Sequence, residues 1–179
     1  LNKSLMLSEK KNTNLVNPFS CFVNSYLNNL NNCFSESINE QINFLAISLR
    51  EAWERGSQIF ICGNGGSAGN AIHIANDFIY GIGGGKKPGI NVEALTANTG
   101  VVTCLANDIG YENIFSHQLT NKARPGDLLI VLSGSGNSKN ICNVLETAKK
   151  NKVFSYAILG FDGGKSFEIA DCPIHFAIN

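Results

Sequence analysis

Two apolar runs in the chain each end in a turn rich in glycine and serine, and a helical pattern follows each turn. Run 59–62 leads into Gly63-Asn64-Gly65-Gly66-Ser67, and run 127–131 leads into Leu132-Ser133-Gly134-Ser135-Gly136-Asn137-Ser138. Small residues let backbone N–H groups turn toward an anion, and the N-terminus of the following helix adds partial positive charge. The repeated strand–turn–helix unit therefore predicts an α/β sheet with two anion-binding turns.

The second turn favours a sugar phosphate over a nucleoside triphosphate. Loops that bind nucleoside triphosphates end in Gly-Lys-Ser/Thr, whereas Lys139 here follows Ser138 instead of preceding a serine. One such turn is also typical of an ordinary βα connection, because helix N-caps select serine and tight turns select glycine. Two of them at one edge of a parallel sheet favour a ligand site, because the carboxyl ends of the strands face one crevice.

Apolar runs and helical patterns alternate along the rest of the chain. Strands are predicted near 59–62, 90–95, 127–132, 153–159 and 173–177, and helices near 67–80, 98–106, 111–122, 138–151 and 165–170. The connections are long enough for right-handed crossovers, so we expect a doubly wound α/β fold with a five-stranded parallel sheet flanked by helices.

Two further helices are predicted within 18–55, ahead of an α/β core at 57–179. The second is the clearer one, because Ser35 can cap its start, Gly56 can end it, and apolar residues recur on one face at Ile38, Ile42, Leu45, Leu49 and Trp53. The polar residues 1–16 are expected to be a disordered tail. With 179 residues and 44% apolar content, the chain is most simply a single domain over 1–179.

Charge and cysteine usage narrow the class of protein. Fourteen basic residues balance fourteen acidic ones, which argues against a nucleic-acid partner. No stretch approaches the roughly 18 consecutive apolar residues of a membrane helix, and the first residues lack the apolar core of a signal peptide. The six cysteines are scattered singly, so we expect reduced thiols in a cytoplasmic protein, with Cys62 more typical of a buried core thiol than of a nucleophile.

The motifs resemble those of the sugar isomerase (SIS) family, from about residue 35 to the end. In order they are Cys62-Gly-Asn-Gly-Gly-Ser67, His73 with Asp77, Ala106-Asn-Asp-Ile-Gly-Tyr-Glu112, Arg124-Pro-Gly-Asp127, Ser133-Gly-Ser-Gly-Asn-Ser138 and Gly160-Phe-Asp-Gly-Gly-Lys165. The combination is similar to that of the phosphoheptose isomerases. These enzymes interconvert sedoheptulose 7-phosphate and a heptose 7-phosphate for surface polysaccharide synthesis (lipopolysaccharide or capsule).

The resemblance implies a role for each matching position. The phosphate would be held by Ser133, Gly134, Ser135 and Ser138, and the sugar by Asn64, Gly65, Gly66, Ser67, Asn107 and Asp108. His73 and Asp77 correspond to a histidine and a carboxylate that bind zinc in some members, and the carboxylate also serves as catalytic base. The i, i+4 spacing places both side chains on one helix face. The resemblance also implies a homotetramer.

The chain departs from the family pattern at two places. The residue at Asp77 is usually glutamate, and aspartate shortens the reach by roughly 1.5 Å, where a misplacement of about 1 Å can cost about a hundredfold in rate. The family also takes a glutamine and a histidine from a C-terminal helix, as metal ligands and catalytic acid. Asn179 is the last residue of the sequence, at the point where that helix would begin, so the acid is unassigned.

Two other functions stay open from the sequence. The chain could be a non-catalytic SIS module that binds a phosphosugar or a protein partner as a regulator. The run Gly63-Asn-Gly65-Gly-Ser-Ala68 also fits a relaxed dinucleotide-binding pattern. Against it, Glu93 lies 30 residues beyond Gly63 and inside its strand, whereas such enzymes place an acid about 20 residues on, at a strand end.

Overall fold

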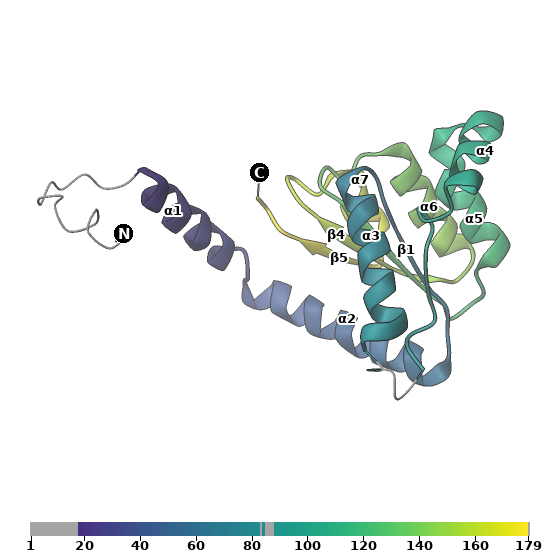
Figure 1. The fold of residues 1–179 in the computed structure, drawn as a ribbon, viewed down its shortest axis with the longest axis horizontal. Helices are drawn as coiled ribbons and strands as arrows, with labels where there is room; N and C mark the ends of the chain where they lie inside the picture. The colour runs from purple at the N-terminus through teal and green to yellow at the C-terminus, as the bar shows by residue number, and fades with distance from the viewer. Residues whose placement is uncertain (1–17, 83, 85–87, 179) are drawn as a thin grey trace, which may run out of the picture. The chain divides into compact units, whose positions relative to one another are not determined.

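The computed structural model describes residues 18–82, 84 and 88–178, which fall into two units, the first ending at Cys33 and the second beginning at Phe34. The first unit contains α1 (Pro18–Asn32; Figure 1). The apolar side chains Phe22, Val23, Tyr26 and Leu27 of this helix are exposed. The expected disordered tail at 1–16 lies outside the described residues. That residues 1–179 form one domain stays a prediction.

The second unit is built on a five-stranded, all-parallel sheet. The strand order is β2-β1-β3-β4-β5, and the strands are β1 (Ile59–Gly63), β2 (Val92–Ala94), β3 (Leu128–Ser133), β4 (Phe154–Leu159) and β5 (Cys172–His175). All five predicted strands are present, and β2 is shorter than its predicted range of 90–95. From β1 the chain passes to β2 at one edge of the sheet, and from β3 it passes through β4 to β5 at the other edge. This arrangement confirms the predicted doubly wound fold.

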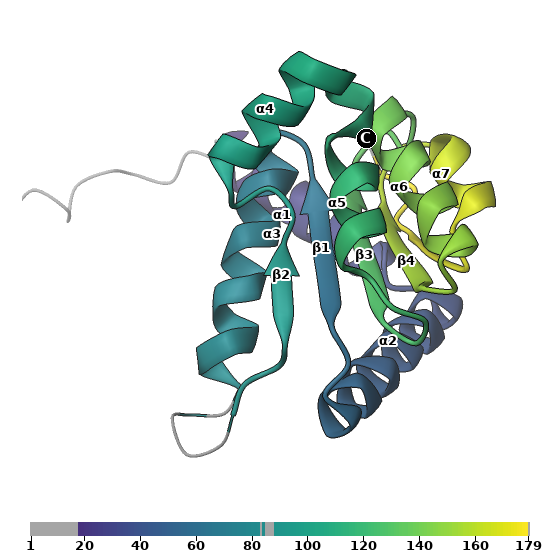
Figure 2. The same ribbon diagram turned by 90° about the vertical axis from the view of Figure 1, so that its right-hand side faces the viewer.

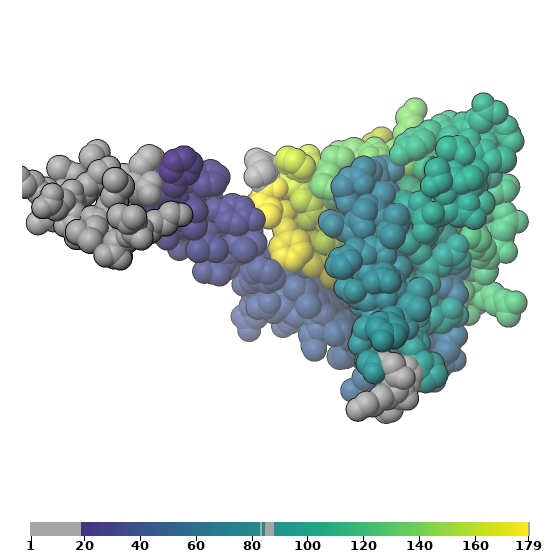
Figure 3. Space-filling view, viewed as in Figure 1, coloured from purple at the N-terminus to yellow at the C-terminus, as the bar shows by residue number. Residues whose placement is uncertain are grey.

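Helices cover both faces of the sheet (Figure 2). The helices α2 (Glu36–Arg55) and α3 (Gly66–Asn76) pack on one face, against side chains such as Ile59 and Ile61. In the space-filling view, α3 lies on the side of the second unit that faces the viewer (Figure 3). The other face, with Phe60 and Cys62, is covered by α4 (Thr99–Ile109), α5 (Ile114–Lys122), α6 (Lys139–Lys150) and α7 (Gly164–Ile169). Successive β1 residues therefore enter two separate cores, as the two-residue period of a strand requires.

The ends of α2 follow the capping signals in the sequence. Ser35 Oγ accepts a hydrogen bond from the backbone N–H of Ile38 (3.3 Å), and Gly56 ends the helix with a left-handed φ of 69°. Near this end, Trp53 Nε1 donates to the carbonyl of Pro88 (3.1 Å) and ties α2 to the segment that enters β2.

The helix predicted at 67–80 changes form near its end. A wider π-turn, η1 (Asp77–Gly81), continues α3, and the N–H of Ile82 bonds to the carbonyl of Asp77 (3.1 Å). This leaves the carbonyl of Phe78 free to accept the N–H of Ile90 (2.8 Å). The π-turn therefore joins the end of α3 to the start of β2.

The helix predicted at 111–122 begins instead with a 3₁₀ turn, η2 (Tyr111–Asn113), which leads into α5. None of the helices in the described part of the chain is long and apolar enough to span a membrane.

Candidate phosphosugar site

The two glycine- and serine-rich turns lie side by side at the switch point of the strand order, between β1 and β3. Gly63 at the end of β1 is in register with Leu132 near the end of β3. After β1 the chain enters α3 on one face, and after β3 it enters α6 on the other. Open α/β sheets bind ligands in the crevice at such a switch point.

The first turn, 63–67, requires glycine for space and for backbone conformation. A Cβ on Gly63 would lie 2.6 Å from Ser67 Cβ and 2.8 Å from the carbonyl oxygen of Leu132. Gly65 has a φ of 54° and ψ of −120°, which an L-residue rarely adopts. The turn closes with a hydrogen bond from the N–H of Ser67 to the carbonyl of Asn64 (3.0 Å). This geometry brings the N-terminus of α3 close to β3.

The second turn, 133–138, is held by hydrogen bonds of its own. Ser133 Oγ accepts the N–H of Gly136 (3.1 Å), and Ser135 Oγ accepts the N–H of Asn137 (3.3 Å). Ser138 caps α6 without a hydrogen bond from its side chain to the helix. The exposed Ser135 and the half-buried Ser138 therefore present their hydroxyls beside the N-terminus of α6, as a phosphate site needs.

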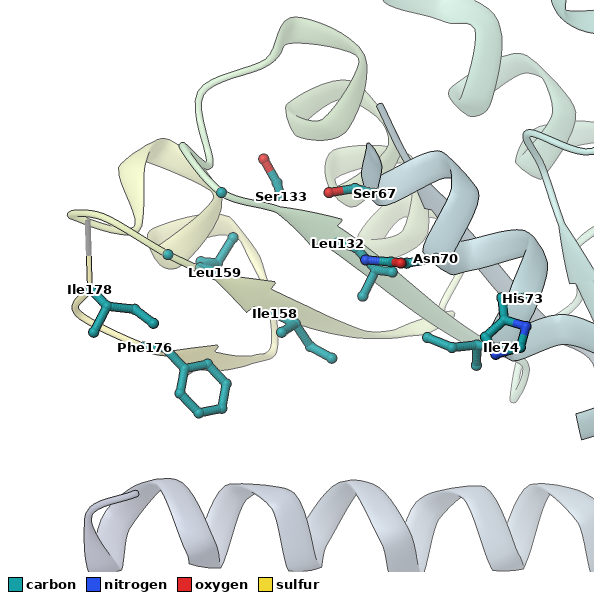
Figure 4. Close-up of a pocket in the computed structure, with 12 residues that line it drawn as sticks. Ser67, Asn70, His73, Ile74, Leu132, Ser133, Ile158, Leu159, Phe176 and Ile178 are labelled. Carbon is teal, nitrogen blue, oxygen red and sulfur yellow. The ribbon is translucent and has the colours of Figure 1, made fainter. Parts of the chain in front are cut away.

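A cleft of about 520 Å³ opens beside the two turns (Figure 4). Ser67 and Ser133 lie at one end of it, and His73 lies further along α3. Its apolar wall consists of Ile74, Leu132, Ile158, Leu159, Phe176 and Ile178. The cleft thus brings together four of the predicted site residues, Ser67, His73, Ser133 and Gly134.

The predicted catalytic pair forms a contact but lies away from the turns. His73 Nε2 is 3.5 Å from Asp77 Oδ2, and the two side chains are 76% and 57% exposed. At 1.5 Å per residue, His73 lies about 9 Å and Asp77 about 15 Å along the helix from Ser67. His73 lines the cleft, whereas Asp77 is not among its lining residues.

Asn107 and Asp108 are at the exposed end of α4. They bond to each other (Asn107 Nδ2 to Asp108 Oδ1, 2.9 Å), and Cys104 Sγ donates to Asp108 Oδ2 (3.4 Å). This hydrogen bond and the charge of Asp108 raise the pKa of the Cys104 thiol. Tyr111, three residues after Asp108, links this part of the chain to the first turn, because its hydroxyl donates to Asn64 Oδ1.

Two residues, Tyr111 and Asn140, bond to Asn64 and were not predicted as site residues from the sequence. Asn64 Oδ1 accepts hydrogen bonds from Tyr111 Oη (2.9 Å) and Asn140 Nδ2 (2.8 Å), and Asn64 Nδ2 donates to Asn140 Oδ1 (2.9 Å). Asn140, in the first turn of α6, is only 1% exposed. A signal was present, because Asn140 precedes the buried Val144 and Ala148 at helical spacing and so shares their face.

The structure also shows the surroundings of Cys62, considered as a nucleophile, and of Glu93, considered for dinucleotide binding. Cys62 is fully buried, and burial raises the pKa of its thiol, so it behaves as a core residue. Glu93, the acid considered for dinucleotide binding, lies within β2 and forms an ion pair with Lys122. It is therefore engaged away from the glycine turn.

The chain belongs to the SIS domain family, whose model matches residues 23–160, and this confirms the resemblance. It is 44% identical over 118 residues to a phosphoheptose isomerase of Akkermansia muciniphila. That match covers 65% of this chain and 61% of the relative, so the chain spans less than two thirds of the relative's length.

Solved structures show the same fold. A phosphoheptose isomerase from Neisseria gonorrhoeae is similar with a TM-score of 0.78 at 26% identity, covering 90% of this chain and 85% of that one. The corresponding enzyme from Francisella tularensis has a TM-score of 0.82 at 23% identity, covering 89% and 84%.

Proposed function

We propose that the protein is a phosphosugar isomerase that interconverts sedoheptulose 7-phosphate and a heptose 7-phosphate, for surface polysaccharide synthesis. The observation that carries this proposal is the pair of turns at the switch point, one suited to a phosphate and the other to a sugar. The phosphoheptose isomerases to which the chain is similar support the choice of substrate.

In the proposed reaction, the turn 133–138 holds the phosphate through serine hydroxyls and backbone N–H groups. The sugar extends past Ser67 toward His73. Asp77 removes the proton from the hydroxyl-bearing carbon next to the carbonyl, and an enediolate forms. The same proton then returns to the neighbouring carbon, while a hydroxyl proton moves between the two oxygens. His73 contacts Asp77 and orients its carboxylate.

Zinc is the metal that the family resemblance suggests, and the residues fit it in part. Tetrahedral zinc with bonds of about 2.0–2.1 Å separates neighbouring ligand atoms by about 3.4 Å. The 3.5 Å between His73 Nε2 and Asp77 Oδ2 agrees with two ligands of one such ion. Across the ranges that the structure describes, no group of three or more His, Cys, Asp or Glu side chains could hold a metal. These two residues would therefore need further ligands, and the proposed proton transfers use the protein's own groups.

Exposed apolar side chains support a homo-oligomer, and we expect a tetramer. In the second unit they include Ile42, Phe44 and Ile47 of α2 and Ile72 of α3. A cytoplasmic location is proposed because all six cysteines are free thiols.

The proposal is tested by turnover of sedoheptulose 7-phosphate, with and without added zinc, by the unmodified protein and the Asp77→Asn variant. We expect turnover in the unmodified protein and a loss of at least a hundredfold in the variant. Binding without turnover under every metal condition would contradict the proposal and favour a non-catalytic phosphosugar-binding module. Glu168→Gln is a suitable control, because Glu168 is exposed, belongs to neither turn and is not a lining residue of the cleft.

A further inference from the structure

Asn140 and Tyr111 take no part in the proposed reaction, yet both bond to Asn64 in the first turn. The Asn64 and Asn140 amides form a reciprocal pair, with one hydrogen bond in each direction at 2.8 and 2.9 Å. Tyr111 Oη adds a third bond at 2.9 Å. The three residues come from the end of β1, the start of α6 and the turn η2, so the network crosses the switch point.

The network occupies most of the hydrogen-bonding capacity of the Asn64 side chain. Its oxygen accepts two hydrogen bonds, and one of its two amide protons is donated to Asn140. The side chain therefore acts mainly within the protein. A sugar at this turn would meet the backbone N–H groups of Gly65 and Gly66 and the hydroxyl of Ser67.

A second contact holds Tyr111 in position for its hydrogen bond to Asn64. Asn143 Nδ2, one turn further along α6, donates to the carbonyl of Glu112 (3.0 Å). The turn η2 is thus fixed to the same helix that carries Asn140. The start of α6 serves as a common support for both turns, because Ser138 at its N-cap also ends the phosphate turn.

We propose that Asn140 and Tyr111 are positioning residues. They set the distance between the first turn, 63–67, where the sugar binds, and the second, the phosphate turn, 133–138. This inference rests on the proposed function, since a phosphosugar must reach both turns at once. Inorganic phosphate needs only the second turn. Loss of the network should therefore weaken binding of a sugar phosphate and spare binding of phosphate, a pattern that general destabilisation would not produce.

The test uses Tyr111→Phe, Asn140→Leu and the double variant, with Tyr26→Phe on α1 as the matched control. Tyr111 is 54% exposed, so removal of its hydroxyl leaves the fold intact. Asn140→Leu keeps the volume of a buried side chain and removes both amide bonds. Dissociation constants for sedoheptulose 7-phosphate and for inorganic phosphate are measured by titration calorimetry, and turnover is measured in parallel.

We expect sedoheptulose 7-phosphate to bind about fivefold more weakly to Tyr111→Phe and at least about tenfold more weakly to Asn140→Leu. Inorganic phosphate should change less than about twofold, and the double variant should lose less than the product of the two single effects. Equal losses for both ligands, or fully multiplicative effects, would overturn the inference. If Asn140→Leu does not fold, the two affinities of Tyr111→Phe decide alone.

These outcomes are distinct from failure of the proposed function. A protein that binds sedoheptulose 7-phosphate without turning it over would refute the isomerase, while the affinities would still decide the positioning role. Unchanged affinities together with normal turnover would refute only the positioning role.

Discussion

Replacement of Gly136 by alanine should displace the phosphate turn. Gly136 has a φ of 63°, and a Cβ at this position would collide with the carbonyl oxygen of Gly163. The carbonyl of Gly136 accepts hydrogen bonds from Ser166 Oγ (2.7 Å) and the Ser166 N–H (2.9 Å). Because the collision pushes the turn away from segment 163–166, both bonds are lost together.

The expected cost has two parts. A left-handed conformation costs an alanine roughly 1–2 kcal/mol. The two lost hydrogen bonds add about 0.5–1.5 kcal/mol each, so the free energy of unfolding should fall by about 2–5 kcal/mol. Gly56→Ala is the matched control, because Gly56 has a φ of 69° and no atom lies within 4 Å of its added Cβ. It should lose only the conformational part.

Urea unfolding of both variants measures these costs, and calorimetry with inorganic phosphate measures the effect on the turn. Gly136→Ala should bind phosphate at least about tenfold more weakly, whereas Gly56→Ala should bind it normally. Equal losses of stability in the two variants, together with unchanged phosphate affinity in Gly136→Ala, would refute this account of the turn.

Three further outcomes concern buried and exposed groups. Asp127→Asn should lower the free energy of unfolding by about 1.5–3 kcal/mol, because the Asp127 carboxylate accepts the N–H groups of Gln58 (2.9 Å) and Arg124 (2.8 Å) and an amide has one acceptor oxygen. Burial raises the pKa of the Cys62 thiol, so above about pH 8.5 the unfolded chain gives up a proton that the folded chain keeps. Since the unfolded state then binds fewer protons, the free energy of unfolding should fall with rising pH, by at most about 1.4 kcal/mol per unit for this group. A thiol reagent at pH 8 should label the exposed Cys104 in the folded protein and Cys62 only after unfolding.

Each of these outcomes has its own check. Glu168→Gln, at an exposed carboxylate, should leave stability unchanged beside Asp127→Asn. Cys62→Ala should reduce the alkaline slope of the unfolding free energy, and an unchanged slope would contradict the assignment to this thiol. Mass spectrometry of labelled peptides identifies which cysteine reacted, and modification of Cys62 at the same rate as Cys104 would show that the core opens readily.

Much of the fold follows from local patterns. The caps of α2 and both glycine turns can be predicted from short segments of sequence. Ser35 and Gly56 contact residues close to them in sequence, and Gly63 lies against Ser67 and the adjoining strand. The order of the strands depends on which distant segments pair, whereas local patterns predict only the number of strands and their parallel direction. The roles expected of individual site residues came from the resemblance to the SIS family.

The site was predictable only in part, because its contacts join distant residues. The bond between Asn64 and Asn140 spans 76 residues, and a polar residue in the first turn of a helix is usually taken as solvent-facing. The π-turn at Asp77 likewise occurs together with a tertiary contact, the bond from the Ile90 N–H to the carbonyl of Phe78. Local periodicity therefore predicts the helix and misses the change of form that begins at Asp77.

The two edge strands affect how copies of this protein can meet. β2 has only three residues, and β5 contains Pro173, which has no N–H to donate. Short edges and prolines discourage the addition of foreign strands that leads to fibrous aggregates. Contacts between copies would therefore use helix side chains, and a single apolar-to-charged substitution on a helix could alter them without disturbing the sheet.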